Sequence, residues 1–239
     1  MHALAQKVID AHGGLDRWMS FRKISAQLWQ GGALWTLKGH PGQLSQTTVT
    51  AGLGAQWASH APFDSTGKVS HFESDLVTIS DANGDTVERL QNPRASFKGH
   101  TLETPWTDPQ LAYFAGLAMW TYFNMPFVLA TAGVETTQID DWTENDETWQ
   151  RLEVVFPKGI ATHSSKQTLY IDGDGLLKRH DYDVEIAGNT PGAHYVSGYT
   201  EVQGIKFPTR RRIFPRQPDG KSLAEPLVVS IDLADIRLS

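Results

Sequence analysis

The feature that most constrains the fold is a long run without any charged side chain, Pro109–Val134, which reads PQLAYFAGLAMWTYFNMPFVLATAGV. Asp108 and Glu135 close it, although 20% of the chain is charged. About 20 apolar residues are enough for a transmembrane helix. However, Asn124 and Pro126 interrupt the run, its flanks are acidic, and no basic residue anchors its ends. The sequence therefore predicts an internal segment rather than a membrane span.

The first part of this run has the features of a buried helix. Thr107 or Asp108 can cap its start, and Pro109 suits the first helical position. Apolar residues cover nearly all of its faces, and such a helix is buried nearly all round. The break at Asn124–Pro126 predicts a second short helix behind it. We call residues 109–134 the plug, which either only fills the core or also lines an apolar cavity with its aromatic side chains.

The rest of the chain consists mainly of short alternating runs with turn residues between them, the pattern of a meandering antiparallel sheet. A helix is expected at residues 2–12, before Gly13-Gly14. Gly31-Gly32 is a hairpin signal between two of the expected strands. The expected strands are residues 24–29, 33–37, 46–50, 55–59, 68–72, 76–80, 86–90, 149–156, 162–171, 176–186, 194–202, 205–214 and 227–233.

These elements predict an α+β fold that is mainly β, with a large curved antiparallel sheet wrapped around the helical plug. The chain has 239 residues, of which 40% are hydrophobic, and no low-complexity linker divides it. That length and composition suffice for one large core. We therefore expect a single domain over residues 1–239, with an N-terminal helical segment at 1–21 and the helical plug at 109–134.

Composition narrows the classes of partner and chemistry. The formal net charge is -6, so nucleic acid is not an expected partner. The chain has no cysteine, which excludes disulfides, thiolate metal sites, cysteine catalysis and an acylated cysteine. Met1–Leu4 leads directly into an amphipathic segment, without a signal peptide. The expected location is cytoplasmic for a full-length chain, and periplasmic or exported if a signal peptide has been removed.

A hairpin in the second half of the chain gathers polar side chains on one face. Its turn is Asp172–Gly175. Pairing about this turn places His180 opposite Gln167, with Tyr182 and His163 on the same face, because side chains alternate along strands. We expect this face to be the concave one, under the plug.

Charged side chains on these strands divide between the two faces. Arg179 and Asp181 fall on the other face of the hairpin, in a pattern typical of a solvent-exposed surface. Arg211, on a later strand, falls inward. Its guanidinium could hold a carboxylate or phosphate bidentately, or it pairs with a buried acid such as Asp183 or Glu201.

Three histidines, His163, His180 and His194, occupy three successive expected strands. They could bind a divalent metal with Asp181 or Asp183 as a carboxylate ligand or orienting group, act as general acid and base, or serve only as hydrogen-bonded core residues. No HExxH or HxH spacing is present, so a metal is not the favoured interpretation and the cofactor stays open. There is also no GxSxG, phosphate loop or dinucleotide fingerprint. His60, in contrast, is expected at a turn, in contact with solvent.

The order of the elements resembles the LolA/LolB-like lipoprotein-carrier superfamily. The resemblance rests on AHGGLDRW at Ala11–Trp18, LYIDGDGLLKRHDYDV at Leu169–Val184 and HYVSGYTEVQGIKFPTRRR at His194–Arg212. It implies a half-barrel, in which an antiparallel sheet curls around helices and its concave face holds a lipid or another hydrophobic ligand. The chain is also similar to an uncharacterised bacterial family that carries GHTLETPW and ATHSSKQTLY segments.

Three functions stay open at this point. The first is the binding of a hydrophobic or amphipathic small molecule, held by apolar area and by a few convergent polar groups. The second is an enzyme, a hydrolase, lyase or isomerase, with His163, His180 and Tyr182 as catalytic residues and with or without a metal. The third is an interaction protein whose cavity is filled by its own plug. The expected ligand-binding residues are Trp106, Phe114, Trp120, Tyr122, His163, His180, Tyr182, His194 and Arg211.

Overall fold

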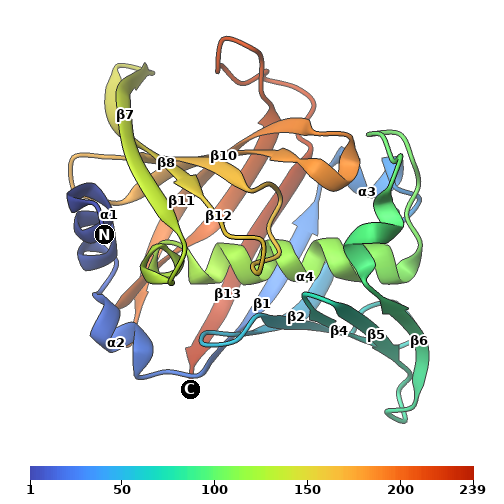
Figure 1. Cartoon of the computed structure of the whole chain (residues 1–239). Helices are drawn as coiled ribbons and strands as arrows, with labels where there is room; N and C mark the ends of the chain where they lie inside the picture. The colour runs from blue at the N-terminus through green and yellow to red at the C-terminus, as the bar shows by residue number, and fades with distance from the viewer.

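One antiparallel sheet of 13 strands curves around a long helix, α4 (Figure 1). The structure is a computed structural model that describes residues 1–239. The α-helices are α1 (Ala3–Ala11), α2 (Leu15–Met19), α3 (Ala33–Leu37) and α4 (Asp108–Asn124), and the 3-10 helices are η1 (Pro93–Phe97), η2 (Phe127–Ala130) and η3 (Glu185–Ala187). The strands are β1 (Lys23–Gly31), β2 (Gln46–Gly52), β3 (Trp57–Ala61), β4 (Val69–Glu73), β5 (Leu76–Ser80), β6 (Thr86–Gln91), β7 (Glu135–Glu144), β8 (Glu147–Val155), β9 (Lys166–Ile171), β10 (Leu177–Val184), β11 (Thr190–Val202), β12 (Ile205–Pro215) and β13 (Val229–Leu238).

The sheet is two meanders joined at the ends of the chain. The strand order is β6-β5-β4-β3-β2-β1-β13-β12-β11-β10-β9-β8-β7, so only the β1–β13 contact joins strands distant in sequence. Between the two meanders, α4 crosses the concave face of the sheet (Figure 1). The predicted α+β, mainly β half-barrel around a helical plug, with an N-terminal helix, is therefore confirmed.

Helix α4 begins and ends where the sequence predicts. Thr107 caps it in a reciprocal capping box with Gln110. Every residue from Pro109 to Asn124 is buried, as a helix with apolar residues on all faces requires. The helix stops before Pro126, and the short helix η2 follows. None of the helices is both long and apolar enough to cross a membrane.

Close packing of α4 on the sheet depends on Gly116. A Cβ atom built at this position would lie 2.3 Å from Cβ and 2.5 Å from Cγ of Phe72 on β4. Phe72 is itself buried in the core and cannot swing away. Gly116 therefore sets how near the helix approaches β4.

Replacing Gly116 with alanine is expected to destabilise the protein by about 1–3 kcal/mol, because overpacking forces the helix off the sheet. Helix propensity alone predicts the opposite sign, a gain of about 1 kcal/mol. Urea denaturation of G116A measures the difference. G173A is the matched control, because a Cβ at Gly173 meets no atom within 4 Å; a G116A protein as stable as G173A would contradict the proposed contact.

One expected strand, residues 33–37, is wrong, because these residues form α3. Gly32 has a φ of +111°, and a Cβ there would lie 2.4 Å from the carbonyl oxygen of Val228. The chain therefore turns at Gly32 against the start of β13, and β1 pairs with β13 instead of forming a hairpin with residues 33–37. Periodicity cannot separate a helix from a strand in an apolar run this short.

The hairpin of β9 and β10 has a different register from the predicted one, but the predicted faces are right. His180 pairs with Leu169, and Tyr182 pairs with Gln167, after an irregularity near Leu177. The displacement from the predicted pairing is two residues in this part of the ladder. A shift of two keeps each side chain on the same face, whereas a shift of one would reverse it.

The expectation that Arg179 and Asp181 face solvent is wrong. Arg179 is 0% exposed and donates from Nε and Nη2 to the two carboxylate oxygens of Asp181, at 2.7 and 2.8 Å. It also donates to Glu144, at the end of β7, at 2.9 Å, and to the carbonyl of Gly220. The end of β7 and the loop after β12 thus cover the outer face of β10, so the ion pair is buried there.

Candidate functional site

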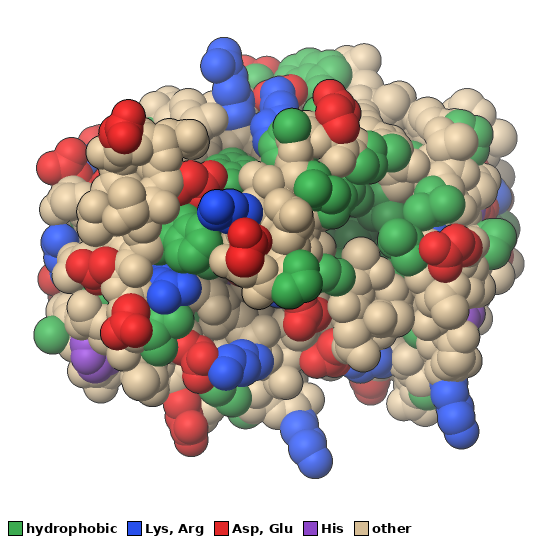
Figure 2. All heavy atoms as spheres, turned by 90° about the horizontal axis from the view of Figure 1, so that it is seen from above, with side chains coloured by type: hydrophobic (Ala, Val, Ile, Leu, Met, Phe, Trp, Pro, Cys, Tyr) green, Lys and Arg blue, Asp and Glu red, His purple; other side chains and the backbone are tan.

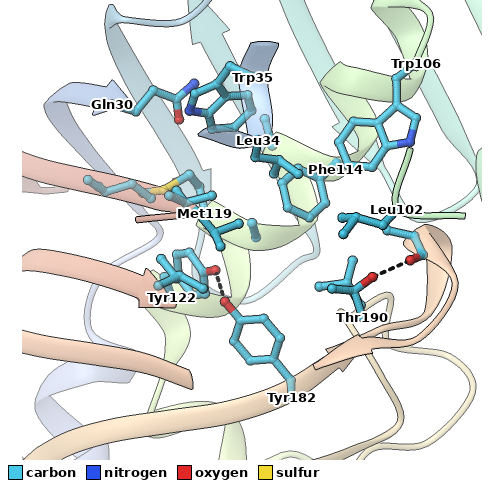
Figure 3. Close-up of a pocket in the computed structure, with 18 residues that line it drawn as sticks. Gln30, Leu34, Trp35, Leu102, Trp106, Phe114, Met119, Tyr122, Tyr182 and Thr190 are labelled. Carbon is cyan, nitrogen blue, oxygen red and sulfur yellow. Dashed lines mark hydrogen bonds between the residues drawn. The ribbon is translucent and has the colours of Figure 1, made fainter. Parts of the chain in front are cut away.

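An apolar pocket lies between α4 and the strands β10 to β13. Of its 18 lining residues, 16 are hydrophobic. Helix α4 contributes one wall, α3 and the end of β1 contribute a second, and η3 with the neighbouring strands completes it (Figure 3). The lining residues are Gln30, Leu34, Trp35, Leu102, Trp106, Phe114, Ala115, Ala118, Met119, Tyr122, Tyr182, Val184, Ala187, Thr190, Ile213, Val228, Val229 and Ile231.

The pocket is narrow. The space between its lining atoms is about 620 Å³ with its open mouth included, but only about 50 Å³ has room for the centre of a water molecule. The face turned toward the viewer in Figure 2 is hollowed, and hydrophobic side chains surround the hollow. A ligand larger than a few water molecules therefore requires lining side chains to move, and Met119 is unbranched and flexible enough to do so.

A pair of tyrosine hydroxyls forms the polar end of the pocket. The hydroxyl oxygens of Tyr122 on α4 and Tyr182 on β10 lie 2.6 Å apart, away from Trp35 and Trp106 (Figure 3). The Tyr122 oxygen also lies 3.3 Å from Nε2 of His163. A connected chain of three polar groups thus begins at the otherwise apolar pocket.

His163 was expected on a strand. It lies instead in the connection between β8 and β9. This connection spans the open side of the half-barrel. Gln56, before β3, forms two hydrogen bonds of 2.8 Å with the backbone of Ala161. Arg94 of η1 donates to the carbonyl of Thr162 at 2.9 Å and pairs with Glu185. These contacts hold His163 against the plug, where its ring stacks on Tyr182 at 4.0 Å between centroids.

His180 and His194 are direct neighbours across β10 and β11. Nε2 of His180 lies 2.5 Å from Oε1 of Gln167, and Gln167 donates to the carbonyl of Ser164 at 2.9 Å. His194 faces the ring of Tyr122, with centroids 4.5 Å apart. Both histidines are buried with His163 in one polar region beneath the plug.

Arg211 on β12 lies in the same region and has no carboxylate partner. Its Nη2 donates to the carbonyl of Tyr122 at 3.1 Å, and its Nη1 donates to Nε2 of His194 at 3.4 Å. The expected pairing with Asp183 or Glu201 is wrong, because Asp183 instead accepts from Arg216 at 2.6 Å and Glu201 is exposed. Arg211 is therefore an inward cation, as alternation predicted, but without a counter-charge.

Burial sets the protonation of these groups. It lowers the pKa of His180 to about 3 and the pKa values of His163 and His194 well below their usual range, with the charge of Arg211 contributing for His180 and His194. Burial raises the pKa of the Tyr122 hydroxyl to about 12. The region beneath the plug thus holds neutral imidazoles and neutral phenols beside one guanidinium.

The chemistry available to this arrangement comes from neutral donors and acceptors and from the one guanidinium of Arg211. No carboxylate orients the imidazoles, whereas a catalytic histidine is usually oriented by a third group. No three side chains of His, Cys, Asp or Glu lie close enough together to hold a metal ion. Catalysis by His163, His180 and Tyr182 stays a prediction.

The structure brings most of the expected ligand-binding residues together, but not Trp120. Trp106, Phe114, Tyr122 and Tyr182 line the pocket, and His163, His180, His194 and Arg211 lie beneath its polar end. Trp120 points elsewhere: its Nε1 donates to the carbonyl of Ala55 at 3.1 Å, and it lines a separate groove beside α2. Trp120 and Tyr122 are two residues apart, which places them on different sides of a helix.

Sequence analysis missed the second wall of the pocket. Leu34 and Trp35 of α3 line this wall, and Met119 on the α4 wall was missed as well. The turn at Gly32 brings α3 to the pocket. This turn was not predicted, because residues 33–37 read as a strand. Met119 has no sequence signal that separates it from the other apolar residues of the plug.

A large antiparallel sheet curled around a buried helix, with an apolar pocket between them, defines a LolA-like half-barrel. Solved structures with this fold include a LolA superfamily protein from Nitrosomonas europaea, with a TM-score of 0.52 and 11% identity over 98% of this chain and 93% of that one. They also include a domain from Vibrio parahaemolyticus with the proposed name outer membrane lipoprotein-sorting protein, with a TM-score of 0.52 and 12% identity over 98% and 90%.

Comparison of the sequence with family models and with curated proteins finds no match. The LolA-like fold, which the order of elements implied, is confirmed by the structural similarity. At 11% and 12% identity this similarity shows the fold alone.

Proposed function

We propose that this protein binds an apolar or amphipathic small molecule in the pocket between α4 and strands β10 to β13. The observation that carries this proposal is the lining itself, with 16 hydrophobic residues among 18 and one polar end at the Tyr122–Tyr182 pair. Ligand pockets typically combine apolar walls with a few convergent polar groups. The apolar part of the ligand lies against Trp35, Phe114 and Met119, and its polar end meets the two hydroxyls.

The fold supports the same proposal. The solved structure from Vibrio parahaemolyticus carries a name that refers to the sorting of lipoproteins, which are proteins with attached acyl chains. A half-barrel with one internal helix can separate slightly from that helix without breaking its strand ladder. Binding then requires the plug and Met119 to move, because the ligand occupies space that they partly fill.

Filling the pocket is expected to abolish ligand binding. Ala118 lines the pocket on α4, so A118F places a ring in the space that the ligand needs. The neutral apolar probe N-phenyl-1-naphthylamine brightens in apolar surroundings, and its titration measures binding. We expect A118F to bind this probe at least about tenfold more weakly than the wild type, a loss of about 1.4 kcal/mol.

The matched control is A82F, because Ala82 is exposed in the turn between β5 and β6. Thermal unfolding by circular dichroism establishes that both variants are folded. Equal probe affinity in a folded A118F and in A82F would place the binding site elsewhere and refute the proposal. Native mass spectrometry of freshly purified wild-type protein is the complementary experiment, with a copurified apolar molecule as the expected result.

A further inference from the structure

The buried guanidinium of Arg211 lacks a negative partner. Its side chain is 4% exposed, and its only acceptors are the Tyr122 carbonyl and Nε2 of His194. The face of the Tyr122 ring lies 4.9 Å from its Cζ. The burial of a charge costs several kcal/mol unless an opposite charge and hydrogen bonds compensate for it. Here the compensation consists of one carbonyl, one imidazole and one aromatic ring.

The carbonyl that accepts from Arg211 belongs to the last turn of α4, where the helix dipole is negative. A helix C-terminus supplies about half of an elementary charge. This contact stabilises the cation in part and holds the end of the plug against β12. It does not use the Nε–H group of Arg211, which is buried and has no partner.

A second donor without an acceptor lies beside it. Because the Nε2 atom of His194 accepts from Arg211 and the imidazole is neutral, the proton of His194 is on Nδ1. That Nδ1 atom is also buried without a partner. Two N–H donors and one positive charge therefore share a region that contains no carboxylate. Buried polar groups are nearly always paired, so unpaired donors of this kind need an explanation.

The region adjoins the inner end of the pocket. Arg211 pairs across the strands with Ile231, and Ile231 pairs with Gln30, so these three residues form one row on the concave face. Both Ile231 and Gln30 line the pocket, as does Ile213, two residues from Arg211 on the same face. The ring of Tyr122, which lines the pocket, lies 4.9 Å from the guanidinium carbon of Arg211.

We propose that the ligand is an apolar monocarboxylate, a single-chain molecule of the fatty-acid class, whose carboxylate binds Arg211 and the Nδ1–H of His194. This inference rests on the proposed function and specifies its ligand. A carboxylate accepts the paired N–H groups of a guanidinium with good geometry. One negative charge matches the one cation, whereas a phosphate dianion would stay half-neutralised in a buried site.

Binding requires the Tyr122 ring to turn away from Arg211. That movement breaks the hydroxyl contacts with Tyr182 at 2.6 Å and with His163 at 3.3 Å. The hydroxyls of Tyr122 and Tyr182 are then free to contact the ligand where its apolar chain meets its carboxylate. The Tyr122–Tyr182 pair therefore has to open for the carboxylate to reach the cation.

The test compares two molecules with the same chain and different charge, dodecanoate and dodecanol, by displacement of N-phenyl-1-naphthylamine from the full-length protein at pH 7. The wild type is expected to bind dodecanoate about 10- to 100-fold more tightly, the range for hydrogen bonds to charged groups. In R211M the ratio of the two affinities should fall toward one. In R211K, which keeps the charge but loses the fork of donors, an intermediate ratio is expected.

The matched control is R210M, because Arg210 is the neighbouring arginine on β12 and is exposed on the other face. Its dodecanoate preference should equal that of the wild type. Equal affinity of the wild-type protein for both molecules would overturn the carboxylate assignment and leave the apolar pocket intact. If the wild type binds neither molecule, the proposed function fails as well. The wild-type comparison decides even if R211M does not fold.

Discussion

Between pH 6.5 and pH 4, the free energy of unfolding is expected to fall by about 1.4 kcal/mol per pH unit for each histidine that the fold keeps neutral. Burial lowers the pKa of His12 and of His60 to about 4 and that of His180 to about 3, from an ordinary value of 6.5. It lowers the pKa values of His163 and His194 as well. Each of these histidines adds to the loss, so acid should remove a large share of the stability of an ordinary domain.

The sign follows from proton binding. Below pH 6.5 the unfolded chain takes up protons on these imidazoles, while the folded protein does not until the pH approaches the lowered pKa values. Protonation therefore favours the unfolded state throughout this window. The stabilising contribution is complete above pH 6.5 and is lost as the pH falls. Urea denaturation at several pH values from 7.5 to 4.5 measures the slope.

His60 provides the cleanest variant, because desolvation is the only cause of its shift. H60L is expected to reduce the pH slope by about 1.4 kcal/mol per unit. The control H71Q removes an exposed histidine from the neighbouring strand β4 and should keep the wild-type slope. A flat stability profile in the wild type, or an unchanged slope in H60L, would show that the folded interior accepts a protonated imidazole.

Replacing Arg179 with methionine is expected to cost about 3–5 kcal/mol, because it leaves the carboxylate of Asp181 buried without its main partner. Burial already raises the pKa of Asp181, against the opposing influence of Arg179. The loss of the guanidinium also removes the hydrogen bond to the Gly220 carbonyl and the ion pair with Glu144. Urea denaturation at pH 7 gives the difference in the free energy of unfolding.

Arg212 is the matched control, because it also binds a carboxylate but at the surface. It pairs with Asp232 at 2.9 Å, with the two side chains 34% and 47% exposed. R212M should therefore cost less than about 1 kcal/mol. The double variant R179M/D181L should lose less stability than R179M alone, since it no longer buries a carboxylate that has lost its bidentate partner. Equal losses in R179M and R212M would contradict the buried role of Arg179.

Local pattern predicted which way the side chains of the second meander point. His180, Tyr182 and Arg211 lie on the concave face, as strict alternation along their strands requires. This held even though the register of β9 and β10 was predicted wrongly, because the error was an even number of residues. The face of each side chain can therefore be predicted correctly even where the residue that pairs with it is predicted wrongly.

The errors share one cause, which is contact between segments distant in sequence. Arg179 and Asp181 look solvent-exposed in the hairpin by itself, but the end of β7 and the loop at Gly220 cover them. His60 was expected at a turn, but it belongs to β3 and is buried. The residue pattern of one strand does not predict which distant segments will cover its outer face.

The charge-free run, by itself, determined that a buried helix stands at the centre of this protein. A helix with apolar residues on every face is stable only inside a core, and the alternating runs around it could supply only a sheet. The tertiary structure alone decided that the plug does not fill the concave face completely. The pocket walls come from α3, α4 and β13, and the lone cation beneath it depends on the absence of any carboxylate nearby. The pocket and the uncompensated charge of Arg211 both arise from packing between distant segments. The order of residues in the sequence predicts neither of them.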